Sequence, residues 1–296
     1  MKYFSSRRGI VLAGGNGTRL APLTSAISKQ LMPVYDKPMI YYPISTLMLC
    51  GIRDILIVTN PDNFELFKKL LGTGEKWGVQ FSYVIQEKAE GVAQAILLAD
   101  KFIDKHSIAI ALGDNLFHGN DLVNLLRSAD KRIDGASVFA YPVSDPENYG
   151  VIQFDKAGNI LDIEEKPDKP LSQYAIPGLY FYDNTVVERV KKLKFSSRGE
   201  IEITSLNKNY LNEKLLSVEI MGRGIAWLDT GSFNSLHDAS SYIRTLEQRQ
   251  GLKVGCPEEA AWRQGWIDEK QLETLALTLM NSGYGEYLYM LLKGLK

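Results

Sequence analysis

The sequence predicts an α/β protein whose mixed, mostly parallel sheet is flanked by helices on both faces. Short apolar runs alternate with longer helical patterns through the first 112 residues. The apolar runs are continuous, as in strands that are buried on both faces. The chain has 296 residues, of which 45% are hydrophobic, so one large domain or two closely packed domains can form an ample core.

The first part supplies the parallel strands and their helices. Strands are predicted at 9–13, 54–58, 79–85 and 107–112. Helices are predicted between them at 38–50, 61–71 and 90–101. Pro38 near the start of the first helix and Gly51 just past its end fit the usual positions of these residues.

Beyond about residue 135 the strands become shorter and the pattern less regular. Further strands are predicted at 136–141, 149–154, 159–164, 176–182, 215–221 and 224–228, with helices at 183–193 and 200–212. From about residue 232 onward the pattern predicts helices, over 233–249, 257–264, 268–281 and 284–293. We therefore expect an α/β core over 1–232. A C-terminal helical segment over 233–296 is expected to serve packing, oligomerisation and possible regulation.

The C-terminal segment is rich in aromatic residues, at Trp262, Trp266, Tyr284, Tyr287 and Tyr289. These residues either pack onto the main sheet or form a subunit interface or regulatory pocket. We expect them to serve both packing and an interface.

Composition excludes several classes of protein. Lys plus Arg number 34 and Asp plus Glu number 35, so the chain lacks the basic excess of a nucleic-acid-binding protein. No stretch approaches the roughly 18 apolar residues of a membrane span, and the N-terminal apolar run is too short for a signal peptide. We therefore expect no membrane partner and a cytoplasmic location.

Cysteine and histidine are too sparse and too scattered for a zinc site. Cys50 and Cys256 form no disulfide framework and show no metal-ligand spacing. His106, His118 and His237 are widely separated, which argues against a zinc enzyme.

The stretch GIVLAGGNGTRL, residues 9–20, resembles a phosphate-binding loop but fits neither common motif. Leu20 stands where a dinucleotide loop needs its third glycine, and no Gly-Lys pair of an ATPase loop occurs. Gly14, Gly15 and Gly17 would let backbone N–H groups approach an anion, and Arg19 adds a planar fork of donors. The alternative is a tight turn with one solvated arginine.

Charged residues recur where predicted strands end. Asp114 follows an apolar strand and a glycine, and Asp229 follows the apolar run GIAWL. Two carboxylates of this kind suit Mg²⁺, although most such aspartates are turn or helix-cap residues. Lys29, in a segment flanked by prolines, suits a second phosphate contact, or it is an ordinary surface lysine.

The pair Glu165–Lys166 lies just before Pro167. Neighbours on a strand point to opposite faces, so both side chains reach one pocket only if the backbone bends there. The alternative is a solvated charged turn.

Together these residues resemble one family. The stretch LAGGNGTRLAPLTSAISKQLMPV is similar to the signature GGxGTRLxPxT…K…PV of sugar-1-phosphate nucleotidylyltransferases. Later stretches, among them ALGDNLFHG, EEKP, GLYFYD, RGEIEITSLN, GRGIAWLDTGS and CPEEAAWRQGWID, resemble the glucose-1-phosphate thymidylyltransferase branch. The resemblance covers nearly the whole chain. It implies a Rossmann-like nucleotidyltransferase fold with an added small sheet and C-terminal helices.

The resemblance also implies roles for individual residues. Catalytic roles fall to Arg19, Lys29, Lys166 and Asp114. The nucleotide would be bound by Gly14, Gly15, Gly17, Thr18, Arg19, Lys29, Gln86 and Gly91, with Gln86 reading the pyrimidine edge. The sugar phosphate would be bound by Asn115, Gly150, Glu165, Lys166, Ile176 and Arg198. Mg²⁺ would be held by Asp114 and Asp229.

The implied reaction is the transfer of a thymidylyl group from dTTP to α-D-glucose 1-phosphate, with release of pyrophosphate. The attacking phosphate is already charged, so positioning and charge stabilisation suffice. A UTP-dependent relative is one alternative, because QEKAEGVAQA carries Glu87 and Ala89 where relatives often have prolines. A non-catalytic nucleotide-sugar sensor would be expected to lose Arg19, Lys29 or one aspartate, and all are present.

Family members often carry a second nucleotide-sugar site between subunits, which gives feedback by dTDP-rhamnose. Here Arg223, Gly255, Glu259 and Arg263 match its approximate location. The resemblance further implies a homotetramer and a place in dTDP-rhamnose biosynthesis.

Overall fold

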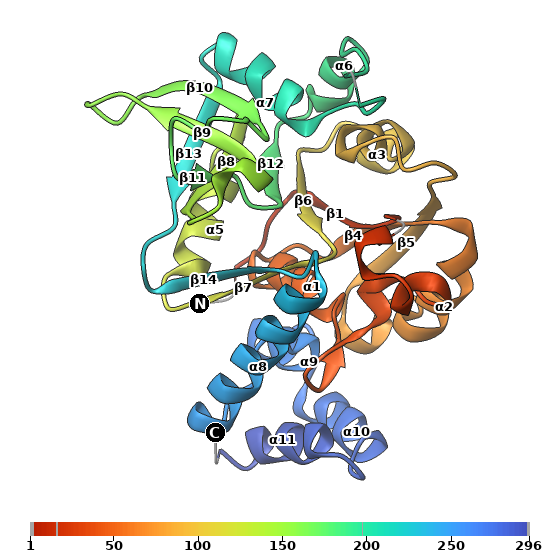
Figure 1. The fold of residues 1–296 in the computed structure, drawn as a ribbon. Coiled ribbons are helices and arrows are strands. Elements are labelled where there is room, and N and C mark those ends of the chain that lie inside the picture. The colour runs from red at the N-terminus through yellow and green to blue at the C-terminus, as the bar shows by residue number, and fades with distance from the viewer. Residues whose placement is uncertain (1–2, 16, 197, 295–296) are drawn as a thin grey trace.

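A single large sheet forms the centre of the computed structural model, which describes residues 3–15, 17–196 and 198–294 (Figure 1). Its parallel half has the order β6 (Ile108–Leu112), β1 (Arg8–Ala13), β4 (Asp54–Thr59) and β5 (Gln80–Ile85). The carboxyl ends of these strands lie along one edge, and the glycine loop begins where β1 ends.

The other half of the sheet continues from β6 with antiparallel pairs. The strands follow in the order β12 (Leu179–Tyr182), β8 (Ala136–Pro142), β11 (Tyr174–Ala175), β9 (Gly150–Phe154) and β10 (Ile160–Glu165). A tenth strand, β13 (Leu216–Ile220), pairs in parallel with β8. This half carries or adjoins Gly150, Glu165, Lys166 and Ile176, which the resemblance assigns to sugar-phosphate binding, whereas Asn115 and Arg198 lie outside it.

Helices cover both faces of the sheet. Successive residues of its strands point alternately into two apolar clusters, one on each face. Val11 and Ile57 belong to one cluster, and their neighbours Ile10 and Leu56 belong to the other. The first cluster includes residues of α1 (Tyr41–Leu49), α2 (Phe64–Leu71) and α5 (Leu122–Lys131). The second includes residues of α3 (Val92–Leu98), α4 (Asp100–Ile103), α6 (Val186–Val190) and α7 (Ile203–Asn212). The predicted fold class is confirmed.

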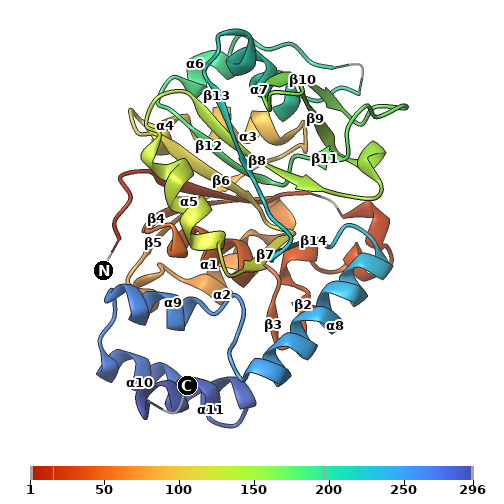
Figure 2. The same ribbon diagram turned by 90° about the vertical axis from the view of Figure 1, so that its left-hand side faces the viewer.

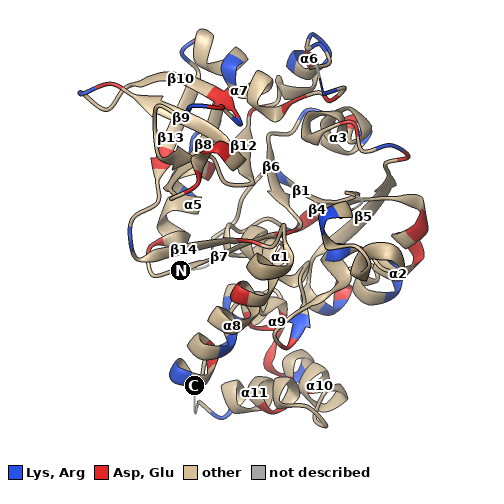
Figure 3. Ribbon diagram, viewed as in Figure 1, with Lys and Arg blue, Asp and Glu red and all other residues tan. Residues whose placement is uncertain are grey.

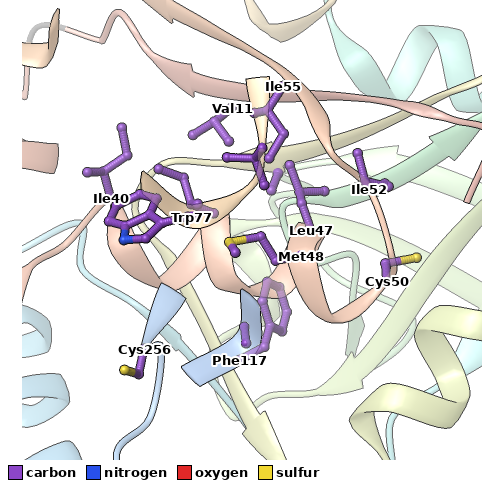
Figure 4. Packing of buried hydrophobic residues seen from close by; sticks show 14 of the residues in the cluster. Val11, Ile40, Leu47, Met48, Cys50, Ile52, Ile55, Trp77, Phe117 and Cys256 are labelled. Atoms are coloured by element: carbon purple, nitrogen blue, oxygen red, sulfur yellow. The ribbon is translucent and has the colours of Figure 1, made fainter. Parts of the chain in front are cut away.

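Of the four C-terminal helices, the last three share the first cluster, and the first packs against Val34, Met39 and Tyr42 in a separate cluster. They are α8 (Phe233–Gln250), α9 (Pro257–Gln264), α10 (Glu269–Thr278) and α11 (Gly283–Leu292), and Figure 2 shows α9, α10 and α11 together beyond α1. Figure 4 shows Cys256 in the same core as Val11, Trp77 and Phe117. Tyr284 and Tyr287 are buried in this cluster, and Trp262, Trp266 and Tyr289 are half-buried against it. The aromatic residues therefore pack onto the body of the protein, while the division at residue 232 stays a prediction.

The largest difference from the sequence prediction lies between residues 113 and 135, where no element was expected. The structure has β7 (Asn115–Gly119) and α5 there. Leu122, Leu126 and Ala129 are buried at helical spacing, so the periodic signal of α5 is present in the sequence. β7 carries no such signal, because its partner β14 (Ile225–Asp229) is more than a hundred residues away.

Several predicted boundaries were also wrong, each for a local reason. The first helix starts at Tyr41 rather than 38, because Lys37–Pro38 forms β3, which pairs with β2 (Pro33–Val34). The helix predicted over 90–101 is interrupted at Ala99, between α3 and α4. The helix predicted from 200 begins at Ile203, after the loop that contains Arg198.

Within the described ranges, no helix is both long enough and apolar enough to cross a membrane. Figure 3 shows Lys and Arg interspersed with Asp and Glu over the molecule, in keeping with a formal net charge of −1.

Candidate functional site

Two adjoining cavities open at the carboxyl ends of the parallel strands. The first, of about 240 Å³, includes these predicted residues: Gly14, Gly15, Gly17, Lys29, Gln86, Gly91 and Asp114. The second, of about 230 Å³, includes Arg19, Asp114, Asn115, Gly150, Glu165, Lys166, Ile176, Arg198 and Asp229. Asp114 and Leu112 line both cavities, so the cavities meet there. Of the predicted residues, Thr18 alone lines neither; it is exposed at the start of a short 3₁₀ helix.

The glycine loop leaves its backbone open to the first cavity. A Cβ atom at Gly15 would meet no heavy atom within 4 Å, so an anion has room beside this peptide. A Cβ atom at Gly14 would lie 2.7 Å from Gln86 Oε1, which only glycine avoids. Gly17 has φ 59° and turns the chain into the 3₁₀ helix that carries Arg19.

Lys29 and Asp114 form an ion pair where the two cavities meet. Lys29 is buried, and its Nζ atom contacts Asp114 Oδ2. Asn115 Nδ2 donates to Asp114 Oδ1 at 3.0 Å. Burial alone would raise the pKa of Asp114, but the charge and hydrogen bond of Lys29, with the hydrogen bond from Asn115, bring it below its ordinary value. Asp114 is therefore an ionised carboxylate at neutral pH.

Asp229 reaches the same place through strand pairing. β14 runs antiparallel to β7 and sets Asp229 opposite Asn115, the residue next to Asp114. Asp229 Oδ1 accepts a hydrogen bond of 2.7 Å from the backbone N–H of Gly231. A Cβ atom at Gly231 would lie 3.0 Å from both Arg19 Nη2 and Asp229 Oδ1, so this glycine admits the guanidinium beside the carboxylate.

The donor set of Asp114 and Asp229 fits Mg²⁺. Both carboxylates line the second cavity, and Asp229 pairs with Asn115, the residue next to Asp114. Mg²⁺ is commonly bound by one or two carboxylates plus substrate phosphates. Among the described residues, no group of three or more His, Cys, Asp and Glu side chains is placed to hold a metal ion.

The backbone bends at Lys166, as the shared pocket of Glu165 and Lys166 requires. β10 ends at Glu165, and Lys166 has the left-handed φ of 45° with its N–H donating 2.9 Å to the carbonyl of Tyr149. Both side chains therefore line the second cavity. Glu165 is held by Arg198 Nη2 at 3.3 Å and by the hydroxyl of Thr204.

Tyr149 and Trp227 line the second cavity but were missed by the sequence reasoning. Their rings lie 5.0 Å apart, and Trp227 Nε1 donates 2.7 Å to Asn115 Oδ1. Burial and the charge of Asp229 raise the pKa of Tyr149 to about 12. A usable signal existed for Trp227, because a strand residue two positions before Asp229 shares its face.

Gly91 makes a close contact with a second loop. It has φ 104°, and a Cβ atom there would lie 2.5 Å from the carbonyl oxygen of Ile201. Ile201 N also donates 2.9 Å to the carbonyl of Glu90. The missing side chain of Gly91 thus makes room for the carbonyl group of Ile201, while Gly91 also lines the first cavity. The segment that contains Gln86 is tied to the segment that carries Arg198.

The residues expected at a regulatory site are only partly brought together. Gly255, Glu259 and Arg263 line a cavity of about 330 Å³ between α1, α5 and α9, which we call the third cavity. Arg263 Nε lies 2.6 Å from Glu259 Oε1. Arg223 lies between β13 and β14 and is not among the residues that line this cavity.

Comparison with known proteins gives consistent matches. The family model for nucleotidyl transferase matches residues 8–245. The glucose-1-phosphate thymidylyltransferase of Mycolicibacterium smegmatis is 56% identical over 96% of this chain and 99% of its own. The protein of the same name from Neisseria meningitidis is 51% identical, over 97% and 99%.

Solved structures share the fold. A crystal structure of a Bacillus anthracis protein in complex with a sucrose has a TM-score of 0.75 at 39% identity, over 80% of this chain and 95% of its own. A UDP-glucose pyrophosphorylase in complex with UDP-glucose has a TM-score of 0.71 at 25% identity, over 81% and 99%.

Proposed function

The chain belongs to the nucleotidyl transferase family, and from this premise we propose that it transfers a thymidylyl group from dTTP to α-D-glucose 1-phosphate. Relatives that are 50–56% identical over nearly the full length are named glucose-1-phosphate thymidylyltransferase. The observation that carries the proposal is that two cavities meet at Asp114. One contains the glycine loop and Gln86, and the other contains Lys166 and Arg198.

In the proposed reaction, a phosphate oxygen of glucose 1-phosphate attacks the α-phosphorus of dTTP. The bond from the α-phosphorus to the bridging oxygen breaks, and pyrophosphate leaves in line with the new bond. The attacking oxygen already carries charge, so the site needs no general base. The glycine loop and Arg19 bind the triphosphate, while Lys166 and Arg198 hold the sugar phosphate. Catalysis then rests on alignment and on charge stabilisation.

Lys29 has a central position in this scheme. Its ammonium group lies at the junction of the two cavities, so it is placed to contact the phosphate on which charge develops. Asp114 keeps the ammonium in place, and Asn115 keeps Asp114 in place. When bound, Mg²⁺ would supply further neutralisation of the phosphate charge, and Asp114 and Asp229 are the residues that would hold it.

The sugar would lie along the second cavity. Glu165 offers carboxylate oxygens to sugar hydroxyls, and its orientation is set by Arg198 and Thr204. Asn115 Oδ1 already accepts from Gly178 N at 3.0 Å and from Trp227, so its Nδ2 side faces Asp114. The floor of this cavity is therefore rigid before substrate binds.

UTP is the second candidate nucleotide. The fold is shared with a UDP-glucose pyrophosphorylase that binds UDP-glucose, and uracil presents the same edge to Gln86 as thymine does. Glu87 and Ala89, at positions where relatives often have prolines, lie in the segment that follows Gln86.

The test is pyrophosphate release from glucose 1-phosphate and Mg²⁺ with each of dTTP, UTP, CTP, ATP and GTP. We expect release mainly with dTTP. Asp114→Asn should lower kcat by about 10³-fold or more. The substitution removes the carboxylate charge that positions Lys29 and that is proposed to bind the metal. Asp134→Asn removes an exposed acid outside both cavities and should leave release unchanged. Preference for another nucleotide would contradict the proposed base. No pyrophosphate release by folded protein with any nucleotide would contradict the proposed reaction.

The third cavity supports a regulatory role, for which we propose a nucleotide sugar such as dTDP-rhamnose as the ligand. Its volume of about 330 Å³ and its mixture of Arg127, Lys253 and Arg263 with Glu259 suit a phosphorylated, polar molecule. We also propose a cytoplasmic homotetramer, for which light scattering of the purified protein is the measurement.

A further inference from the structure

The side chains of Gln94 and Glu90 form a hydrogen-bonded row with Gln86 and hold its amide. Gln86 Nε2 donates a hydrogen bond to Gln94 Oε1, and Gln94 Nε2 donates one of 2.6 Å to Glu90 Oε2. Gln86 lines the first cavity and is buried, and Gln94 and Glu90 are half-buried. Gln94 lies on the first turn of α3, and Glu90 lies in the loop just before that helix.

The chemistry of Glu90 sets the direction of the whole row. An ionised carboxylate only accepts hydrogen bonds, so Gln94 must turn its NH₂ group toward Glu90. The carbonyl oxygen of Gln94 then points to Gln86, which must donate a hydrogen bond from its own NH₂ group. Each glutamine could otherwise present either end of its amide. The carboxylate, together with the backbone N–H of Glu90, which donates 3.4 Å to Gln94 Oε1, removes that freedom from both.

The remaining polar atom of Gln86 is its carbonyl oxygen, and it lies toward the glycine loop. A Cβ atom at Gly14 would sit 2.7 Å from Oε1, so the glycine leaves this oxygen exposed to the first cavity. In the part of the chain that the structure describes, no donor is bonded to it. The row therefore presents a fixed acceptor at the place where the nucleotide base is proposed to bind.

We infer that Glu90 and Gln94 are positioning residues that lock Gln86 with its carbonyl oxygen toward the base, so that the site accepts thymine or uracil and rejects cytosine. Thymine and uracil carry an N–H donor at ring position N3, whereas cytosine carries a lone pair there. An acceptor that cannot turn would face a second acceptor in cytosine, and a site built around a hydrogen bond discriminates strongly against a ligand that cannot form it. The inference rests on the proposed function, because it assumes that Gln86 reads the base.

The experiment compares kcat/KM for dTTP, UTP and CTP, with glucose 1-phosphate as the second substrate, in four proteins. They are the wild type, Glu90→Gln, Glu87→Gln and the double variant Glu90→Gln with Gln94→Glu. Glu87→Gln is the matched control, because it removes the same charge from the same segment at an exposed residue. The double variant moves the carboxylate from position 90 to position 94, where it would accept a hydrogen bond from Gln86 directly.

We expect the ratio of kcat/KM for CTP to that for dTTP to rise about tenfold or more in Glu90→Gln, because both amides regain the freedom to turn. The ratio should equal the wild-type value in Glu87→Gln and return toward it in the double variant. Since each ratio is taken on one preparation, it does not depend on the fraction of protein that is folded.

An unchanged ratio in Glu90→Gln, or equal losses with all three nucleotides, would overturn the inference and leave Gln94 and Glu90 with a structural role only. A raised ratio that the double variant does not lower would overturn it as well. Failure of the proposed function looks different, because the wild type itself would then show no preference for dTTP and UTP.

Discussion

At the scale of the residue, the site works through side chains whose orientation is fixed by neighbours before substrate arrives. Lys29, Asp114 and Asn115 form one such set, and Gln86, Gln94 and Glu90 form another. Fixed donors and acceptors need no reorganisation during the reaction, which is why they stabilise charge more effectively than solvent does.

Arg263 allows the proposed regulation to be tested separately from catalysis. It lines the third cavity and is more than half exposed, and it lies in α9, far along the chain from the glycine loop. Arg263→Ala should abolish feedback inhibition by dTDP-rhamnose while kcat and KM for both substrates stay within about twofold of the wild type, since it removes a phosphate donor from this cavity only. Initial rates measured with increasing dTDP-rhamnose provide the check. Unchanged inhibition in the variant would end the regulatory proposal.

At the scale of the element, two loops act as one. The segment that follows β5 carries Gln86 and Gly91, and the segment that precedes α7 carries Arg198 and Ile201. The contact of Gly91 with Ile201 joins the loop proposed to bind the nucleotide to the loop proposed to bind the sugar phosphate. Binding of either substrate should therefore order a part of the site that the other one uses.

Gly91→Ala tests this connection. Its Cβ atom would lie 2.5 Å from the Ile201 carbonyl at a φ of 104°, so both loops must shift. We expect KM to rise at least about threefold for both dTTP and glucose 1-phosphate, which steady-state kinetics will show. Gly158→Ala is the matched control, because Gly158 also has a positive φ, of 86°, and a Cβ atom there meets nothing within 4 Å. A rise in KM for dTTP alone would contradict the connection.

At the scale of the whole molecule, a buried ionic cluster ties the N-terminal core to the C-terminal helices. Lys37 Nζ lies 2.6 Å from Asp36 Oδ1 and 2.9 Å from Glu247 Oε1 in α8. Lys253, just after α8, lies 3.2 Å from Glu247 Oε2 and also contacts Asp36. Burial alone would raise the pKa of Asp36, but the two lysines lower it, so the carboxylate stays charged.

Lys37→Met should lower the free energy of unfolding by about 3 kcal/mol, because it leaves Glu247 buried with one cation fewer. Chemical denaturation monitored by circular dichroism measures this loss. Lys69→Met, at an exposed position of α2, should change stability by less than about 0.5 kcal/mol. If Lys37→Met unfolded in two separate transitions, the segments 1–232 and 233–296 would be independent units. A single transition would show that they fold together.

The sequence by itself determined the parallel half of the sheet and the character of the glycine loop. The apolar runs and the glycine cluster, which fits neither common motif, are local features. Local features can be recognised directly in the sequence. The periodicity of α5 is equally local, so that helix could have been predicted from the same kind of signal.

Only the tertiary structure decided which residues meet. Asp229 lies beside Asp114 because β14 pairs with β7, and Gly91 faces Ile201 because two distant loops pack together. The row from Glu90 to Gln86 depends on the direction of α3 after a loop with no regular structure. Such contacts join residues that are far apart in the chain or linked by irregular backbone, and hydrophobic periodicity carries no information about either.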